Sequence, residues 1–353
     1  MLRHRFLAAL VPVALIVSAC GDDDGADVRN IGDECGGSAS ASGASGSEPS
    51  GSAASGSETS ETTEASGSAS GSASGSASGG SASCPSGSGS ASGSGISGEV
   101  EGSSTDNPLV EDAVVTYTAY VSEQVDATIA ATTTFTDAVR AGDLAAAKAA
   151  YAPSRQGWER IEPIAGLVEE IDGKVDARVD DFENEQDPTF TGWHRIEYIL
   201  FSQNTTEGAA PFADQLDADL QTLKTELAEI EIPPAALAVG SSELIEEVST
   251  GKITGEEDRY SGTDLWDFAA NVEGSEEAFT QLTPAIEEED PELVAEIEAQ
   301  FAELDTQLGK YTDGAGGYQP YSALTEADKA AMQTTLAALS ENLATVAGVL
   351  GLE

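Results

Sequence analysis

Basic side chains are scarce in this sequence, with 15 Lys and Arg against 63 Asp and Glu, so the formal net charge is −48. An excess of negative charge this large argues against binding to nucleic acid, to acidic polysaccharide and to anionic lipid headgroups. It favours binding to cations instead. Many of the acids are nevertheless expected only to keep the protein soluble.

Long hydrophobic runs are absent after the N-terminal segment, so no later segment is expected to cross a membrane. The apolar run at residues 6–17 follows a short basic region and is too short to span a bilayer, which is typical of a signal peptide. It ends in VSAC at residues 17–20, which resembles a bacterial lipobox. The resemblance implies a lipoprotein signal peptide over residues 1–19 and a lipid on Cys20, which would anchor the protein on the extracytoplasmic face of the membrane. The alternative is an ordinary secretory signal followed by a chance cysteine.

Cysteine is rare too, with three in the chain. Cys35 and Cys84 lie in a stretch made almost entirely of Gly, Ser, Ala and acids, and their spacing is not that of a metal site. Such a composition cannot bury enough apolar surface to offset the entropy of ordering the chain. Residues 20–107 are therefore predicted to be a disordered tether. In an oxidising compartment Cys35 and Cys84 can pair within it without shaping a fold.

Residues 108–353 lack the alternating pattern of β-strands and show apolar residues at steps of three and four, which predicts helices almost throughout. The first helix is expected to end at Gly142. Asp143 is expected to cap a second helix, interrupted near Pro153 and again at Pro163. Further helices are expected at residues 192–203, 212–230, 234–249, 264–287, 291–311 and 325–350. The sequence thus predicts an all-α domain, built as a helical bundle.

A faint internal repeat bears on how the bundle is organised. The segment FTDAVRAGDLAAAKAAY, from Phe135, aligns with LTPAIEEEDPELVAEIE, from Leu282, and Asp143 then matches Asp290. The alignment covers one pair of helices in each half. It predicts two related helical pairs, and with them two related four-helix halves.

Histidine is nearly absent, since His194 is the only one after the first few residues. It lies in TGWHRIEYILF, at residues 191–201, three residues before Glu197. On a helix, Glu197 falls between Trp193 and Phe201 on the apolar side, and His194 lies one turn away at the edge of that face. A buried carboxylate there needs a partner. A metal ion shared with His194 is one such partner. A His–Glu hydrogen bond and a salt bridge to an arginine from elsewhere are the alternatives.

Acidic clusters elsewhere provide further candidate ligands. Glu159 and Glu162 are three residues apart in WERIEP, Asp176 begins DARVDD, and Glu257 lies in GEEDRY. The same clusters contain Asp180, Asp181, Glu256 and Asp258. Each cluster alone is more often a solvated group of charges. Together with one imidazole, several carboxylates favour iron, calcium or manganese over a thiolate-seeking metal.

At this level of detail the sequence resembles the imelysin-like M75 domain of the EfeO and EfeM iron-uptake lipoproteins. The resemblance covers nearly all of residues 108–353 and runs through AYVSEQVDATIAATTTFTDAVRAGDLAAAKAAYAPSRQGWERIEPIA, TGWHRIEYILF, GKITGEEDRYSGTDLWDF and GGYQPYSALTEADK. It implies an all-helical fold that binds iron, ferrous or ferric, or another divalent metal. It also implies two partners, an Efe-type iron permease and a haem peroxidase-like protein. The implied ligands are His194 and Glu197 of the HxxE motif, with Glu159, Glu162, Asp176 and Glu257 as companion acids.

Two departures from the family pattern qualify this expectation. Full-length EfeO members carry a cupredoxin domain at the place of the tether, so the chain resembles the shorter EfeM form. Many relatives have histidine where this chain has Gly262 in YSGTDLWDF.

Two other functions are alternatives to iron binding. The family was once classed with metallopeptidases, but an HExxH-type zinc site needs two histidines one turn apart, and only His194 remains after the signal peptide. The protein is therefore expected not to be an enzyme. Polysaccharide capture is a further alternative, which the negative charge disfavours for acidic glycans.

Overall fold

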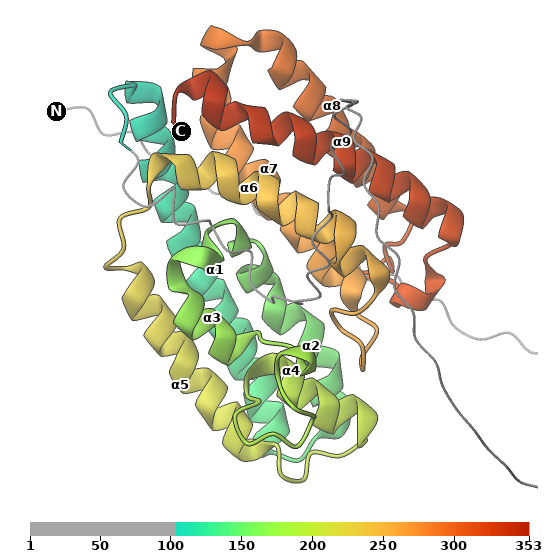
Figure 1. Cartoon of the computed structure of the whole chain (residues 1–353). Helices are drawn as coiled ribbons and strands as arrows, with labels where there is room; N and C mark the ends of the chain where they lie inside the picture. The colour runs from blue at the N-terminus through green and yellow to red at the C-terminus, as the bar shows by residue number, and fades with distance from the viewer. Residues whose placement is uncertain (1–103, 353) are drawn as a thin grey trace, which may run out of the picture. The chain divides into compact units, whose positions relative to one another are not determined.

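The computed structural model describes residues 104–352, which are almost entirely helical (Figure 1). The long helices are α1 (Pro108–Arg140), α2 (Leu144–Glu159), α5 (Ala210–Leu227), α6 (Pro234–Thr250), α7 (Asp264–Glu289), α8 (Pro291–Gly309) and α9 (Glu326–Leu350). Shorter helical segments are η1 (Glu162–Val168), α3 (Glu169–Val175), η2 (Val179–Asp181), α4 (Gly192–Glu197), η3 (Tyr198–Ser202), η4 (Lys252–Thr254) and η5 (Tyr321–Ala323).

The all-α prediction is confirmed for this part of the chain. Residues 104–352 contain no β-strand, and only Thr312 and Tyr318 form an isolated bridge. Several predictions fall outside the described residues: the signal peptide, the lipidation of Cys20, the pairing of Cys35 and Cys84, and all but the last four residues of the tether.

The helices form two groups that meet along α7. In the second half of the domain, α6, α7, α8 and α9 pack in sequence order, and α9 closes against α6 (Figure 1). In the first half, α1 packs against α2 and α5, and the short α3 and α4 lie against α5. Because α7 contacts both α1 and α2, the halves share one continuous core.

The internal repeat corresponds to equivalent turns in the two halves. Asp143 accepts a hydrogen bond from the backbone N–H of Ala146 at the start of α2, at 3.0 Å. Asp290 accepts one from the backbone N–H of Leu293 at the start of α8, also at 3.0 Å. Each aspartate thus satisfies an N–H group that the helix itself leaves unpaired.

The interruption predicted near Pro153 is wrong, because α2 runs unbroken from Leu144 to Glu159 with this proline inside it. A proline removes one helical hydrogen bond. Here Ala152, Ser154 and Arg155 on either side of it are buried, so packing keeps the helix continuous.

The break predicted at Pro163 is confirmed, and it places two acids side by side. The helix α2 ends at Glu159 and the chain turns into η1 at Glu162. This corner touches two glycines directly. A Cβ on Gly240 of α6 would lie 1.7 Å from the carbonyl oxygen of Pro163, and one on Gly274 of α7 would lie 2.1 Å from that of Arg160. The close backbone approach holds the corner against both α6 and α7.

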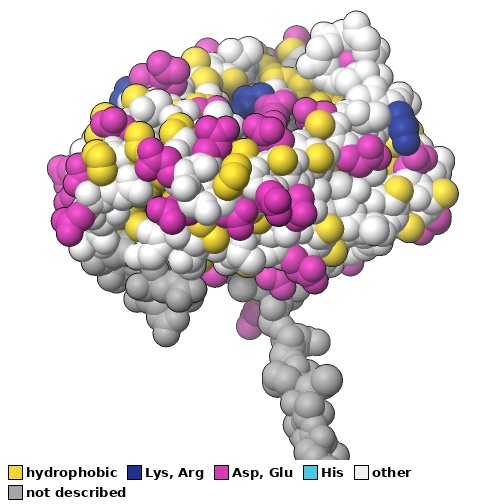
Figure 2. All heavy atoms as spheres, turned by 90° about the horizontal axis from the view of Figure 1, so that it is seen from above, with side chains coloured by type: hydrophobic (Ala, Val, Ile, Leu, Met, Phe, Trp, Pro, Cys, Tyr) yellow, Lys and Arg dark blue, Asp and Glu magenta, His cyan; other side chains and the backbone are white. Residues whose placement is uncertain are grey.

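The surface of the domain reflects its composition. On the face in Figure 2, acidic side chains are spread over the molecule and basic ones are few. Within residues 104–352, no helix combines the length and apolar character needed to cross a bilayer.

Candidate metal centre

All six candidate ligands are buried, and they fall into three groups of neighbouring side chains that share Asp176 or His194. They come from the end of α2, the start of η1, the residue after α3, the helix α4 and the turn before α7. Their exposed fractions are 0% for Glu159, 7% for Glu162, 6% for Asp176, 2% for His194, 0% for Glu197 and 4% for Glu257. Asp180, Asp181 and Glu256, which belong to the same sequence clusters, are exposed.

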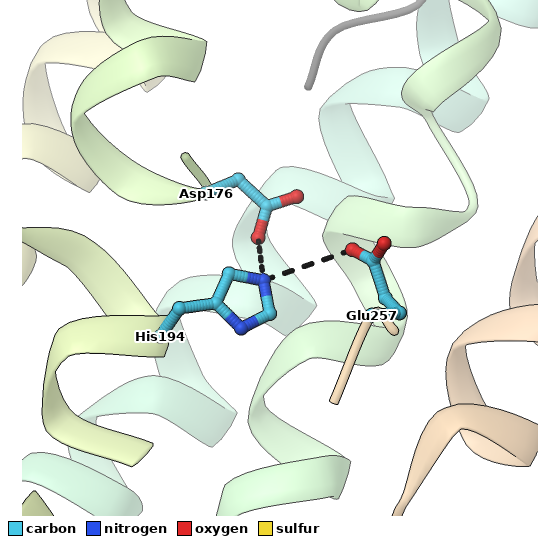
Figure 3. A group of neighbouring side chains, drawn as sticks. All are labelled: Asp176, His194 and Glu257. Carbon is cyan, nitrogen blue, oxygen red and sulfur yellow. Dashed lines mark ion pairs between the residues drawn. The ribbon is translucent and has the colours of Figure 1, made fainter. Parts of the chain in front are cut away.

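One edge of the His194 ring, at Nε2, points at two carboxylates (Figure 3). Its Nε2 atom lies 3.5 Å from Asp176 Oδ1 and 3.7 Å from Glu257 Oε1 (Figure 3). Nε2 is buried and makes no hydrogen bond. One ligand atom from each of these three residues lies within 4.8 Å of the others, which is a spacing that a single metal ion can bridge.

The opposite ring nitrogen contacts Glu197. His194 Nδ1 lies 3.2 Å from Glu197 Oε2. The other carboxylate oxygen, Oε1, accepts hydrogen bonds from the backbone N–H groups of Tyr260 at 2.9 Å and Ser261 at 2.7 Å. Of the two alternatives to a metal, the His–Glu hydrogen bond is therefore present. The groups outside this helix that bind Glu197 are two backbone N–H groups, and not an arginine side chain.

The helix changes its winding directly after Glu197. The predicted helix over residues 192–203 consists of α4 and a π-helical turn, η3, in which Gln203 donates its N–H to the carbonyl of Tyr198 at 3.1 Å. Turns of this kind are rare and occur often at functional sites.

Glu159, Glu162 and Asp176 form a second group of possible ligands. The amide of Asn271, on α7, donates to Glu159 Oε2 at 3.0 Å and to Glu162 Oε2 at 2.5 Å. The ammonium of Lys252 lies 3.1 Å from the first of these oxygens and 2.6 Å from the second. Since Asp176 belongs to both groups, the two positions are adjacent.

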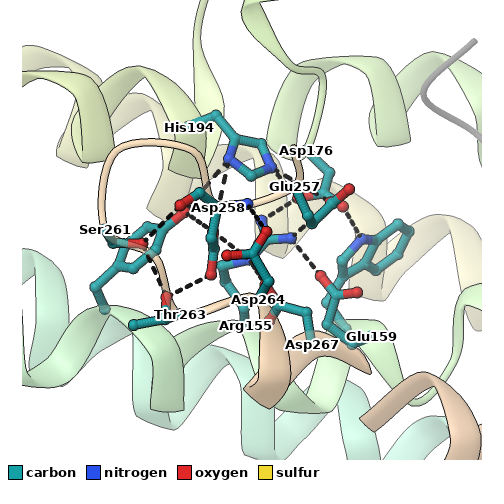
Figure 4. Close-up of polar contacts among 12 residues, drawn as sticks. Arg155, Glu159, Asp176, His194, Glu257, Asp258, Ser261, Thr263, Asp264 and Asp267 are labelled. Atoms are coloured by element: carbon teal, nitrogen blue, oxygen red, sulfur yellow. Dashed lines mark hydrogen bonds and ion pairs between the residues drawn. The ribbon is translucent and has the colours of Figure 1, made fainter. Parts of the chain in front are cut away.

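Sequence reasoning missed Arg155, which is fully buried at the centre of these acids (Figure 4). Its guanidinium forms ion pairs with five carboxylates, those of Glu159, Asp176, Glu257, Asp258 and Asp267. The one available signal was the spacing of Arg155 and Glu159, four residues apart on a helix. Sequence reasoning also missed Lys252, Asp267 and Asn271, which carry no local pattern.

These neighbours keep the carboxylates nearest to His194 ionised. Burial raises the pKa of Asp176, but Arg155 and His194 outweigh it, so that the pKa is lower than usual. Burial also raises the pKa of Glu257, yet Lys252 and Arg178 bring it well below its usual value. Two ionised oxygen ligands thus face the imidazole.

The imidazole itself is protonated in the absence of metal. Burial and the charge of Arg155 lower the pKa of His194. The surrounding carboxylates, with Glu197 first among them, outweigh both and raise it to about 9. A cation binding at Nε2 must therefore replace a proton.

Asp172, next to the second group, should make the stability of the metal-free protein depend on pH. Burial, and then the charge of Asp176, raises the pKa of Asp172 to about 8. The folded protein therefore binds this proton more tightly than the unfolded chain, and stability should fall as pH rises from about 4 to 8. Asp172→Asn, which cannot ionise, should be more stable than the unsubstituted protein at pH 8 by at least about 1.4 kcal/mol, equivalent to one pKa unit.

Urea unfolding at pH 5 and pH 8 with a chelator present measures this difference. The exposed Asp112→Asn on α1 is the control, and it should leave the pH dependence unchanged. If the free energy of unfolding changes equally between pH 5 and pH 8 in Asp172→Asn and in the unsubstituted protein, the pH dependence does not come from Asp172.

The loop that carries Glu257 and Asp258 also contains Gly262. This glycine has φ +70°, and its carbonyl accepts a hydrogen bond from the N–H of Tyr321 at 2.9 Å. Glycine adopts this left-handed conformation without strain. The loop thus supplies acids to the centre but no second imidazole.

Comparison with known protein families agrees with this fold. The family model for imelysin (peptidase M75) matches residues 113–346, which is more than half of the chain. The chain therefore belongs to the imelysin family.

Among curated proteins, the chain is similar to the iron uptake system component EfeO of Escherichia coli O157:H7, of Escherichia coli K12 and of Shigella flexneri. Each is 48% identical over 242 residues, which cover 68% of this chain and 64% of the relative. The match thus spans less than two thirds of the length of these relatives. Their name is that of an uptake component and not of an enzyme.

Proposed function

We propose that this chain is the iron-binding component of an Efe-type iron uptake system, held at the extracytoplasmic face of the cell membrane by a lipid on Cys20. Ferrous or ferric iron is the cargo, which binds at the buried centre and passes to a membrane permease. A haem peroxidase-like protein is the further partner. The signal peptide at residues 1–19 and the tether at residues 20–107 belong to this proposal. The name of the relatives supports the cargo and the uptake role.

The observation that carries the proposal is the convergence of His194 Nε2 with Asp176 Oδ1 and Glu257 Oε1. These ligands, one imidazole and two ionised carboxylates, suit iron. A ligating imidazole commonly uses its other nitrogen to bind a carboxylate, which orients the ring. Glu197 occupies that position at 3.2 Å, and it is itself a ligand if iron binds instead with His194 and Asp258. Glu159 and Glu162 complete the centre through Asp176.

Iron titration of the mature, chelator-stripped chain tests this function. The unsubstituted protein should bind iron in preference to calcium, and the double variant Asp176→Asn, Glu257→Gln should lose at least about tenfold in affinity, the usual scale for disrupting such sites. The control is Glu183→Gln, Glu256→Gln, which removes two exposed carboxylates that lie close in the sequence to Asp176 and Glu257. Equal iron binding by the two double variants would exclude the assigned centre.

A further inference from the structure

Lys252 is buried in the centre, with 3% of its surface exposed. Its ammonium lies 3.1 Å from Glu159 Oε2, 2.6 Å from Glu162 Oε2 and 3.8 Å from Glu257 Oε1. All three carboxylates belong to the groups that a metal ion at the two adjacent positions would use. An ammonium and a metal ion therefore compete for the same negative charge.

Lys252 and Arg155 are both cations in this centre, but they are attached differently. Arg155 lies within the long helix α2 and binds five carboxylates through a rigid fork, and its guanidinium also lies 5.6 Å from the centre of the Trp193 ring. Lys252 begins the three-residue η4 and reaches the acids by a flexible four-carbon stem. Lys252 is thus the cation that can leave without disturbing a helix.

The backbone under Lys252 is held in place, so the side chain is the part that can move. The hydroxyl of Tyr321 donates to the carbonyl of Ile253 at 2.8 Å. The ring of Tyr321 also lies against Gly255, where a Cβ would be 2.2 Å from it. The half-buried Glu247, on the last turn of α6, is a further acid whose charge acts on Lys252.

We propose that Lys252 is a displaceable counter-ion of the metal centre. Its ammonium neutralises Glu159 and Glu162 in the metal-free protein, turns away toward Glu247 when iron binds, and returns when iron leaves. This inference rests on the proposed iron binding. It adds a role for a residue that is not itself a metal ligand. It makes the lysine a residue that weakens binding, which allows a buried centre to release its cargo.

Labelling with an amine-reactive acetylating ester, read by mass spectrometry, tests the displacement in the unsubstituted protein. Lys252 should be protected without metal, and iron should raise its labelling by about tenfold, as expected when a buried group becomes accessible. The exposed Lys174 and Lys310 serve as internal standards whose labelling iron should not change.

Two variants measure the effect on affinity. Lys252→Met, and Lys252→Gln as a second variant that can still donate a hydrogen bond, should bind iron about tenfold more tightly, which corresponds to about 1.4 kcal/mol. They should also release iron to a chelator more slowly. Lys174→Met, which removes an exposed lysine paired with Glu170, is the matched control and should bind as the unsubstituted protein does.

The outcomes separate this inference from the proposed function. If the unsubstituted protein binds iron, but Lys252 stays protected and neither variant binds more tightly, the displacement is wrong and the iron centre stands. If the unsubstituted protein binds no iron, both are wrong.

Discussion

Arg155→Met is expected to destabilise the domain severely at neutral pH. The guanidinium of Arg155 is fully buried and forms ion pairs with five carboxylates, all of them buried as well. Methionine fills much of the same volume but removes the one guanidinium that pairs with all five carboxylates. Removing one partner of a buried ion pair usually costs about 3–5 kcal/mol, which is a large part of the about 5–15 kcal/mol by which an ordinary domain is stable.

Arg140→Met is the matched control for this prediction. Arg140 forms three ion pairs, with Asp137, Asp214 and Asp217, but 31% of its side chain is exposed. Exposed ion pairs contribute little, so this variant should lose at most about 1 kcal/mol. Denaturant unfolding of both variants with a chelator present makes the comparison. If Arg155→Met and Arg140→Met lose a similar amount of unfolding free energy, Arg155 does not hold the acids together.

Iron should stabilise the unsubstituted protein, and His194→Ala should remove most of that gain. A ligand that binds only the folded state adds about 2.7 kcal/mol when its concentration is a hundred times Kd. Because the pKa of His194 is raised to about 9, protons compete with iron at neutral pH, and the gain should grow as pH rises from 6 to 8. The metal-free variant should fold, since Glu197 keeps its hydrogen bonds from Tyr260 and Ser261.

Thermal unfolding of His194→Ala with and without iron measures the stability of the metal-free variant and the gain that iron adds. Glu183→Gln, which changes an exposed side chain, is the control. A purely structural His–Glu pair predicts the reverse result. His194→Ala would then destabilise the metal-free protein by about 1–3 kcal/mol, and iron would stabilise it as much as the unsubstituted protein. That pattern would rule out His194 as a ligand.

Much of the fold could be predicted from the sequence because helices are governed by local spacing. The start of α1 at Pro108 and the caps at Asp143, Asp290 and Thr325 follow from residues within one turn of each other. Pro153 is the exception, since burial on both sides of it outweighs the local preference.

Part of the centre was predictable for the same reason. Glu197 follows His194 by three positions, which places both on the buried face of one short helix, and both are buried in the structure. The guanidinium of Arg195, the residue after His194, lies over the ring of Phe212, 4.8 Å from its centre. Such positions depend only on the period of a helix.

The sequence by itself determined the helices, the excess of acid and the candidate ligands, because each is encoded within a few neighbouring residues. Only the tertiary structure decided which charges meet. Arg155 and Asp267 are 112 residues apart, and Lys252 lies 90 residues from Glu162. Nothing in the local pattern of either cation indicates these partners. They meet because glycines let α6 and α7 approach the corner after α2, and because a buried carboxylate is stable only beside a charge or donor that packing brings to it.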